Sequence, residues 1–212
     1  DLVALGTVAD VVPLDFNNRV LVAQGLARIR AGRCVPGIRA LLEIARRDRA
    51  DLTASDLGFA IAPRLNAAGR LDDMSIGIRC LLADREVEAR SLAARLDQLN
   101  VERRAIEGQM QVQALAAVRH LGPIATPGAR QRSGVCLFDA TWHQGVVGLV
   151  ASRIKERLRR PVVAFAHGGD GLLRGSARSV AGVHVRDVLE NIAARHPGLI
   201  VRFGGHAMAA GL

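Results

Sequence analysis

The amino-acid sequence predicts an α/β protein in which one long helix joins two parts. Residues 84–120 contain no proline, and their apolar positions recur every three or four residues, with one gap of seven, as on one face of a helix. Residues 123–132 are rich in proline, glycine and alanine and have little to bury, which predicts a linker. After them, short apolar runs alternate with helical patterns, as in a small α/β domain.

Within the first part, turn residues separate apolar segments. The run at 2–5 predicts a short strand or buried segment, followed by a loop that reaches Asn18. Thr53 or Ser55 is suited to cap a helix that ends before Pro63. Helical spacing predicts further helices over 19–30, 37–47 and 75–82.

The long helix would measure about 35 residues, or ~50 Å at 1.5 Å per residue. A coiled coil is the alternative, but leucine does not fill every core position, so a connecting strut is favoured. The second part is predicted to contain strands at 135–138, 161–166 and 172–180, helices at 145–159 and 184–195, and a turn at 167–171.

The charge balance indicates a polyanionic partner. The chain has 29 lysine and arginine residues against 20 acidic ones, a net charge of +9, and Lys155 is the only lysine. Arginine binds phosphate well, although base composition of the coding sequence also enriches it; the excess charge is the stronger indication of nucleic acid. No apolar stretch approaches the ~20 residues of a membrane span, which predicts a soluble protein.

The cysteines indicate the cellular compartment, and the two ends of the sequence indicate whether it is part of a longer protein. Cys34, Cys80 and Cys136 are odd in number and form no CxxC pair, which predicts a reducing cytoplasm and excludes a disulfide scaffold or zinc ribbon. The chain begins at Asp1 without a methionine or a signal segment, and it stops within a glycine- and alanine-rich motif. We therefore expect an internal segment of a longer protein.

Two candidate sites lie in the first part. Asp10 follows the predicted apolar strand, where α/β sheets place ligand-binding side chains, although a cap or turn is the more common role of such an aspartate. Arg64, Asn66 and Arg70 surround small residues that would let a phosphodiester approach the backbone. A helix-end turn carrying two solvated arginines is the alternative.

Three candidate sites lie in the second part. Ser176 and Arg178 alternate along a strand and therefore share a face, where both could reach one phosphate. Trp142 lies between a predicted strand and a predicted helix. It is either a core residue or a platform on which a base stacks. The remaining candidates are His143 and Gln144 beside that tryptophan, and Gly204, Gly205 and His206 ahead of a predicted helical start that would attract an anion.

Five segments together carry a resemblance to a known family. They read DLVALGTVADVVPL, PRLNAAGRLDD, WHQGVVGLVASRIKERLRRPVVAF, GSARS and GGHAMAAGL, in this order over nearly the whole chain. The sequence resembles the bacterial RecJ family of single-strand-specific 5′-to-3′ DNA exonucleases, within the DHH phosphoesterase superfamily. The resemblance implies that residues 1–83 are the C-terminal part of a DHH domain, 84–122 a connecting helix and 123–212 a DHHA1 domain truncated at its C-terminus.

The resemblance also implies a chemistry and roles for the candidate residues. In the family, two manganese or magnesium ions drive phosphodiester hydrolysis in DNA repair and recombination. Asp10 is similar to the aspartate of the last metal motif, and the other metal motifs would lie upstream, so these 212 residues alone should be inactive. By the same resemblance the substrate-binding set is Arg64, Asn66, Arg70, His143, Gln144, Ser176, Arg178, Gly204, Gly205 and His206.

Other functions within the superfamily remain as alternatives. They are hydrolysis of short oligonucleotides, hydrolysis of cyclic dinucleotides, and nucleic-acid binding without catalysis. The long helix and the charge of +9 favour a long DNA strand. The expected partners are single-stranded DNA and, among proteins, helicases or single-strand-binding protein, with no membrane.

Overall fold

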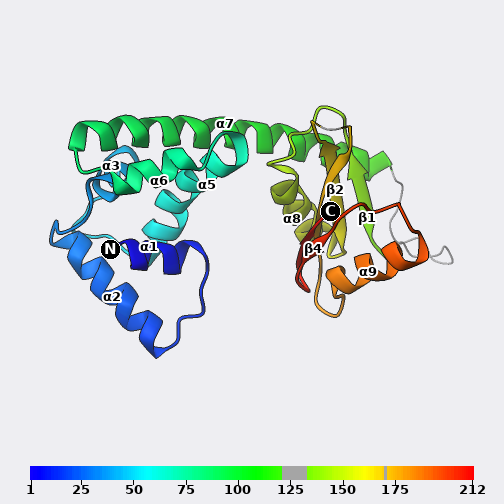
Figure 1. Ribbon diagram of the computed structural model, residues 1–212, viewed down its shortest axis with the longest axis horizontal. Helices are drawn as coiled ribbons and strands as arrows, with labels where there is room; N and C mark the ends of the chain where they lie inside the picture. The colour runs from blue at the N-terminus through cyan, green and yellow to red at the C-terminus, as the bar shows by residue number, and fades with distance from the viewer. Residues whose placement is uncertain (121–132, 170) are drawn as a thin grey trace. The chain divides into compact units, whose positions relative to one another are not determined.

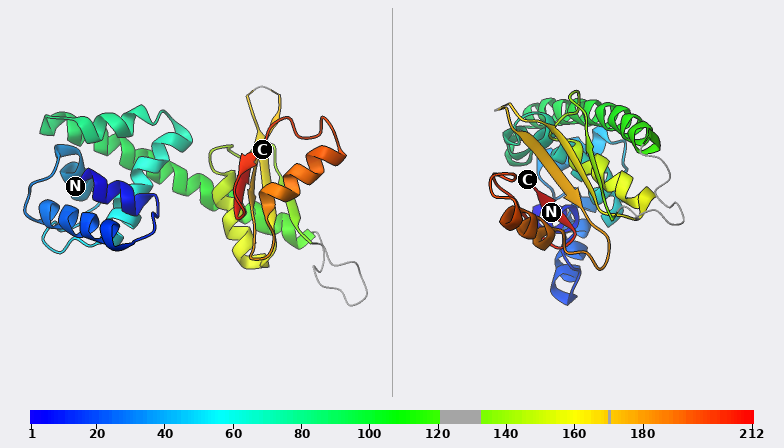
Figure 2. Two further views of the ribbon diagram at one scale, coloured as in Figure 1. Left: turned by 60° about the horizontal axis from the view of Figure 1, so that its bottom comes forward. Right: turned by 90° about the vertical axis from the view of Figure 1, so that its right-hand side faces the viewer.

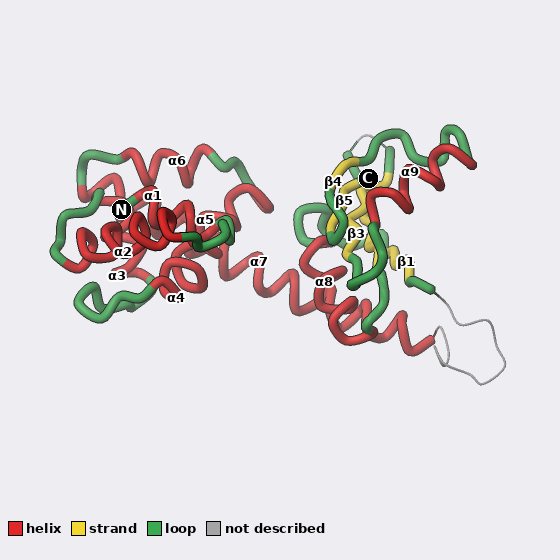
Figure 3. Tube along the Cα trace, turned by 90° about the horizontal axis from the view of Figure 1, so that it is seen from below, coloured by secondary structure: helices red, strands yellow, loops and turns green. Residues whose placement is uncertain are grey.

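The computed structural model describes residues 1–120, 133–169 and 171–212, so the predicted linker at 123–132 and part of the predicted turn at 167–171 lie outside the described residues (Figure 1). The chain divides into two compact units, Asp1–Arg103 and Arg104–Leu212, and the division falls within the long helix. All strands of the described residues belong to the second unit (Figure 3). The α/β fold class is confirmed, whereas the domain boundaries at 83/84 and 122/123 stay a prediction.

The first unit is helical around one apolar core. Side chains that are fully buried there include Ile29, Leu41, Ile61 and Leu96. The elements are α1 (Leu2–Ala9), α2 (Phe16–Arg30), α3 (Pro36–Ile44), α4 (Ala54–Asp56), the π-helical turn η1 (Leu57–Ile61), α5 (Ala62–Leu71), α6 (Ser75–Leu82) and the first half of α7 (Glu86–His120). Figure 2 shows the helices of this unit from two further directions.

Of the two structures predicted for residues 2–5, the strand is wrong, because these residues begin helix α1, whereas Ala4 and Leu5 are buried as the alternative predicts. The Asp1 carboxylate accepts hydrogen bonds from the backbone N–H of Leu2 and of Val35, both at 2.8 Å, and so caps the helix while fixing the chain before α3. Ala4 packs so closely against Gly25 of α2 that a Cβ at Gly25 would overlap the methyl group of Ala4. Packing against α2 therefore stabilises a helix in this run.

Helix α2 begins at Phe16, three residues before the predicted start. The Asp15 carboxylate accepts a hydrogen bond of 2.8 Å from the Asn18 N–H at its N-terminus. We expect Asp15→Ala to lower the free energy of unfolding of this unit by about 1 kcal/mol, as the loss of an N-cap does. Urea unfolding followed by circular dichroism measures this loss, and Asp51→Ala removes the same charge from an exposed residue of this unit as a control. Equal stabilities of the two variants would show that the cap contributes nothing.

The helix predicted to end before Pro63 continues through it, so this prediction is wrong. Between α4 and α5 the chain widens into the turn η1, in which the Ala62 N–H bonds to the Leu57 carbonyl five residues back. Pro63 is tolerated because the wide turn ends directly before α5 and already interrupts the ladder of i→i−4 hydrogen bonds that a proline N–H would otherwise have to continue. Residues 64–70 therefore lie on a helix and not in a turn. Ala67 and Ala68 are fully buried, so their small size serves core packing.

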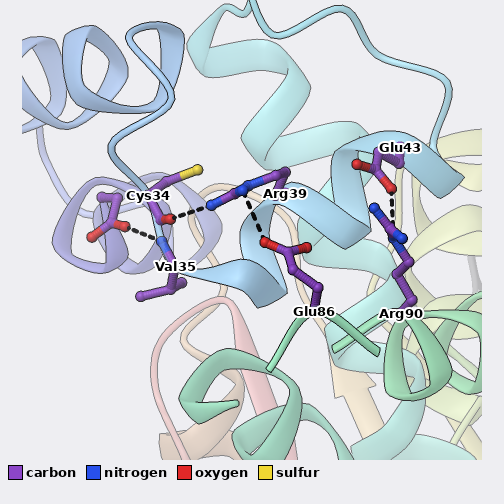
Figure 4. A network of polar contacts seen from close by, with 7 residues as sticks. Cys34, Val35, Arg39, Glu43, Glu86 and Arg90 are labelled. Atoms are coloured by element: carbon purple, nitrogen blue, oxygen red, sulfur yellow. Dashed lines mark hydrogen bonds and ion pairs between the residues drawn. The ribbon is translucent and has the colours of Figure 1, made fainter. Parts of the chain in front are cut away.

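Polar contacts join α3 to the start of α7 (Figure 4). Arg39 donates to the Cys34 carbonyl at 3.3 Å and pairs with Glu86 at 2.8 Å, while Arg90 pairs with Glu43 at 3.2 Å. Such partly exposed pairs add little stability. The long helix is held in this unit chiefly by its buried apolar face, which comprises Ala89, Ala93, Leu96 and Leu99.

The second unit is a five-stranded sheet with helices packed on it. Its elements are the second half of α7, β1 (Val135–Phe138), α8 (Val147–Leu158), β2 (Val162–His167), β3 (Leu173–Arg178), α9 (Val185–Arg195), β4 (Gly204–Gly205) and β5 (Ala209–Gly211). Strand β1 is parallel to β2, and the other neighbouring strands are antiparallel, in the order β1-β2-β3-β5-β4. None of the helices in the described parts of the chain is both long and apolar enough to span a membrane.

The two faces of the sheet carry different helices. Ala177 of β3 and Ala210 of β5 are buried with Val185 and Leu189, so α9 covers their face. Side chains alternate along a strand, which turns Ser176 to the opposite face, where helix α8 packs. The polar side chains of β3 thus point toward the start of α8.

The helical start predicted after Gly205 is wrong, because 204–211 form a β-hairpin. The His206 N–H donates to the Ala209 carbonyl at 2.8 Å and closes the turn. Gly205 has a φ of 148°, and a Cβ there would overlap the Ala209 carbonyl, so only glycine fits this position. Pairing with β3 extends this alanine-rich segment into strand β5.

Candidate nucleic-acid interface

The connection between β1 and α8 is built by an aspartate turn. The Asp139 carboxylate accepts hydrogen bonds from the hydroxyl of Thr141 at 2.7 Å and from its N–H at 2.8 Å. The hydroxyl bond, followed by the backbone bond, lowers the pKa of Asp139, so the turn is held by an ionised group at neutral pH. This turn places Trp142 and His143 directly before α8.

Trp142 is a core residue, and its exposed fraction is only 5%. Its indole N–H donates to Gln113 Oε1 of α7 at 3.0 Å, which satisfies the buried donor. The ring is therefore not available to stack on a base. Of the two interpretations left open by the sequence, the core interpretation is confirmed.

His143 is half-buried, and its ring is oriented by the backbone. Nδ1 accepts a hydrogen bond of 3.1 Å from the Gly145 N–H, so the neutral ring carries its proton on Nε2. The neighbouring Gln144 is exposed. These residues present side-chain donors immediately before the N-terminus of α8, where helix dipoles favour negative charge.

Ser176 and Arg178 share one face of β3 and contact each other. Arg178 Nη1 donates to Ser176 Oγ and to the Ala177 carbonyl, each at 2.8 Å. Both side chains are half-buried, and they lie against Gly148 in the first turn of α8. The structure thus brings a hydroxyl, a guanidinium and a helix N-terminus together in one place.

The glycine-rich hairpin adjoins this cluster through the sheet. Ser176 pairs with Gly211, which pairs with Gly204 in turn. Two strand spacings put Gly204 about 10 Å from Ser176. Gly204, Gly205 and His206 are all exposed at the outer edge of the sheet, so backbone and imidazole groups are accessible there.

In the first unit, Asp10 follows a helix and not the predicted strand. It is the exposed C-terminal cap residue of α1. Nowhere in residues 1–120, 133–169 and 171–212 do three or more His, Cys, Asp or Glu side chains gather into a possible metal site. The described residues therefore do not form a two-metal centre by themselves, although Asp10 can offer one carboxylate ligand.

The other candidates of the first unit lie on α5. Arg64 is not a solvated arginine: its Nε pairs with Asp97 at 2.8 Å, its Nη1 donates to the Ala60 carbonyl at 2.6 Å, and its side chain is 17% exposed. Asn66 is exposed and lines an apolar cavity of about 360 Å³ together with Ala9, the neighbour of Asp10. Arg70 is half-buried in the last turn of the helix.

Two residues of these clusters were not predicted from the sequence. Asp97 binds Arg64 from a position 33 residues away, and nothing in the local pattern marks it. Gly148 touches the cluster on β3, but in the sequence it reads only as one of two glycines at a helix start. Their roles depend on tertiary contacts.

The chain is similar to known proteins over its whole length. The DHHA1 domain profile matches residues 131–212. The single-stranded-DNA-specific exonuclease RecJ of Dickeya dadantii is 62% identical over the whole chain, which spans 36% of that relative. RecJ of Thermus thermophilus in complex with Mg²⁺ superimposes with a TM-score of 0.81 at 37% identity over 98% of this chain and 30% of the other. Its complex with Mn²⁺ also gives 0.81, at 38% identity over 99% and 29%.

These matches cover every element of both units, while the chain spans about a third of the length of the curated relatives. The resemblance carried by the five segments is therefore confirmed. The second unit matches the DHHA1 domain, and the whole chain is similar to a segment that makes up about a third of single-stranded-DNA-specific exonucleases of the RecJ type.

Proposed function

We propose that this chain takes part in the 5′-to-3′ hydrolysis of single-stranded DNA and that its second unit holds a phosphate of the strand. The observation that carries the proposal is the contact of Arg178 with Ser176 at the start of α8. A guanidinium held by a neighbouring hydroxyl is already oriented, so it loses little freedom on binding a phosphate. The name of the relatives supports DNA as the anion.

The remaining candidates extend this contact along the strand. The Nε2–H of His143 and the amide of Gln144 are suited to donate to phosphate or sugar oxygens beside α8. Gly204 and Gly205 let a DNA backbone approach the edge of the sheet without meeting a side chain. With the tryptophan buried, backbone contacts dominate, and little preference among bases is expected.

The proposed reaction depends on divalent metal ions, which the Thermus thermophilus relatives bind as Mg²⁺ or Mn²⁺. Bound metals of this kind activate a water for in-line attack and stabilise the leaving oxygen. Asp10 supplies one ligand in this proposal, and the described residues gather no cluster of three or more His, Cys, Asp or Glu side chains around it. Arg64, Asn66 and Arg70 of the first unit are proposed to bind the substrate, and Arg64 does so while it stays paired with Asp97.

The protein is also proposed to lie in the cytoplasm and to bind helicases or single-strand-binding protein.

Salt dependence tests the electrostatic part of the proposal. The affinity of the 212-residue chain for oligothymidylate should fall linearly on a log–log plot against salt, with a slope of about −0.7 for each phosphate neutralised. The net charge of +9 is the reason for this expectation. Fluorescence anisotropy between about 50 and 200 mM salt measures the slope. An affinity that does not change with salt would show that the excess of arginine reflects only the base composition of the coding sequence.

A further inference from the structure

A glycine in the first turn of α8 leaves the space that the Arg178 guanidinium occupies. An ideal Cβ at Gly148 would lie 2.8 Å from Arg178 Nη2 and 2.9 Å from Ser176 Oγ. Both distances are shorter than carbon makes with such atoms. Any side chain at position 148 therefore competes with the guanidinium for the same volume.

The atoms that a methyl group would meet decide which part of the molecule gives way. They belong to the ends of two side chains, and the third nearest atom is Arg178 Cζ at 3.6 Å. The arginine side chain can rotate away, whereas α8 and β3 need not move. Alanine is also a better helix former than glycine, so helix α8 should tolerate the change.

That rotation would change the orientation of the Arg178 guanidinium. Its Nη1 now bonds to Ser176 Oγ and to the Ala177 carbonyl. A guanidinium that leaves the space beside Gly148 gives up this fixed geometry. It keeps its charge but no longer presents its donors together with the Ser176 hydroxyl.

We infer that Gly148 is a positioning residue for phosphate recognition: it holds no substrate itself, but its missing side chain seats the Arg178 guanidinium beside Ser176. The inference rests on the proposed function of Arg178. Gly148 carries no charge and contributes to that function only by leaving space for the guanidinium. One methyl group at this position should thus lower the affinity for DNA while helix α8 stays formed.

Four variants of the 212-residue chain test this inference: Gly148→Ala, Arg178→Ala, the double variant and Gly108→Ala. Gly108 is the matched control, because it is a helical glycine of the same unit and its added Cβ would have nothing within 4 Å. The probe is oligothymidylate with either a 5′-phosphate or a 5′-hydroxyl. Binding is measured by anisotropy at constant salt, and stability by thermal unfolding.

Gly148→Ala should weaken binding of the 5′-phosphorylated probe by about 10-fold or more, as Arg178→Ala should, with a smaller loss for the 5′-hydroxyl probe. The double variant should lose no more than Arg178→Ala alone, because Gly148 acts through the arginine. Gly108→Ala should bind normally. Gly108→Ala should unfold at the original temperature or above it, and Gly148→Ala should remain folded at the temperature of the binding assay.

The possible failures are distinct. If Arg178→Ala weakens binding and Gly148→Ala does not, the inference is wrong and the proposed function stands. Additive losses in the double variant would mean that Gly148 acts by another route, which also overturns the inference. If Arg178→Ala binds both probes normally, the proposed function of this residue fails and the inference fails with it.

Discussion

Asp10→Ala should abolish metal-dependent DNA hydrolysis in a chimera in which these 212 residues replace the matching segment of the Dickeya dadantii relative, which is 62% identical. Loss of residues that only support a metal ligand commonly costs 10- to 100-fold, so loss of a ligand should cost at least about 100-fold. Binding of DNA should be largely retained, because Ser176 and Arg178, which are proposed to hold a phosphate, lie in the other unit. Digestion of single-stranded DNA in Mn²⁺ and a separate binding assay measure the two effects.

Asp51→Ala is the control, since it removes one exposed carboxylate from the same unit. It should leave hydrolysis at the rate of the unmodified chimera. The 212-residue chain on its own should show no metal-dependent hydrolysis, because one carboxylate cannot hold two divalent ions. A chimera carrying Asp10→Ala that digests DNA at the original rate would show that Asp10 is not a ligand.

If a charge-assisted hydrogen bond to phosphate is lost, Arg178→Ala should raise the activation free energy of DNA hydrolysis by the same chimera by about 2 kcal/mol. The rate of hydrolysis should then fall by ~30-fold. The comparison is with Arg195→Ala, which removes one positive charge from an exposed position in the last turn of α9. Both variants weaken long-range attraction equally. Only the first removes the guanidinium that is hydrogen-bonded to Ser176.

The end of the substrate makes this comparison sharper. If Arg178 binds the terminal phosphate, the loss should be larger for strands with a 5′-phosphate than for strands that end in a hydroxyl. Steady-state digestion of the two substrates at equal salt gives the ratio. Equal losses for both arginine variants on both substrates would assign Arg178 to the general basic surface.

The sequence predicted the elements whose patterns are strong and local. The helix at Ser75–Leu82 and the strand at Val135–Phe138 have the predicted bounds, and α7 begins two residues after its predicted start. The shared face of Ser176 and Arg178 also followed from strand alternation alone. In these segments, periodicity and tertiary packing favour the same structure.

The errors arise where a distant segment decides the local structure. Residues 2–5 are apolar without a clear period, and the helix there depends on an Asp1 carboxylate that also binds the Val35 N–H. Residues 209–211 contain two alanines, which favour helix, but pairing with β3 makes them a strand. The space beside Gly148 is likewise invisible in the sequence, because α8 and β3 must first meet.

The wide turn η1 absorbs one residue and so lets a proline stand within a continuous helical segment. A turn of this kind holds one residue more than an α-helical turn, because its hydrogen bond spans five residues and not four. A single-residue deletion within Leu57–Ile61 would therefore leave a plain α-helical turn, and α5 would keep its orientation relative to α4. Pro63 would then interrupt a regular ladder of hydrogen bonds in the helix interior, which costs about 3 kcal/mol. Relatives that lack one residue in this turn should therefore also lack a proline at the position of Pro63.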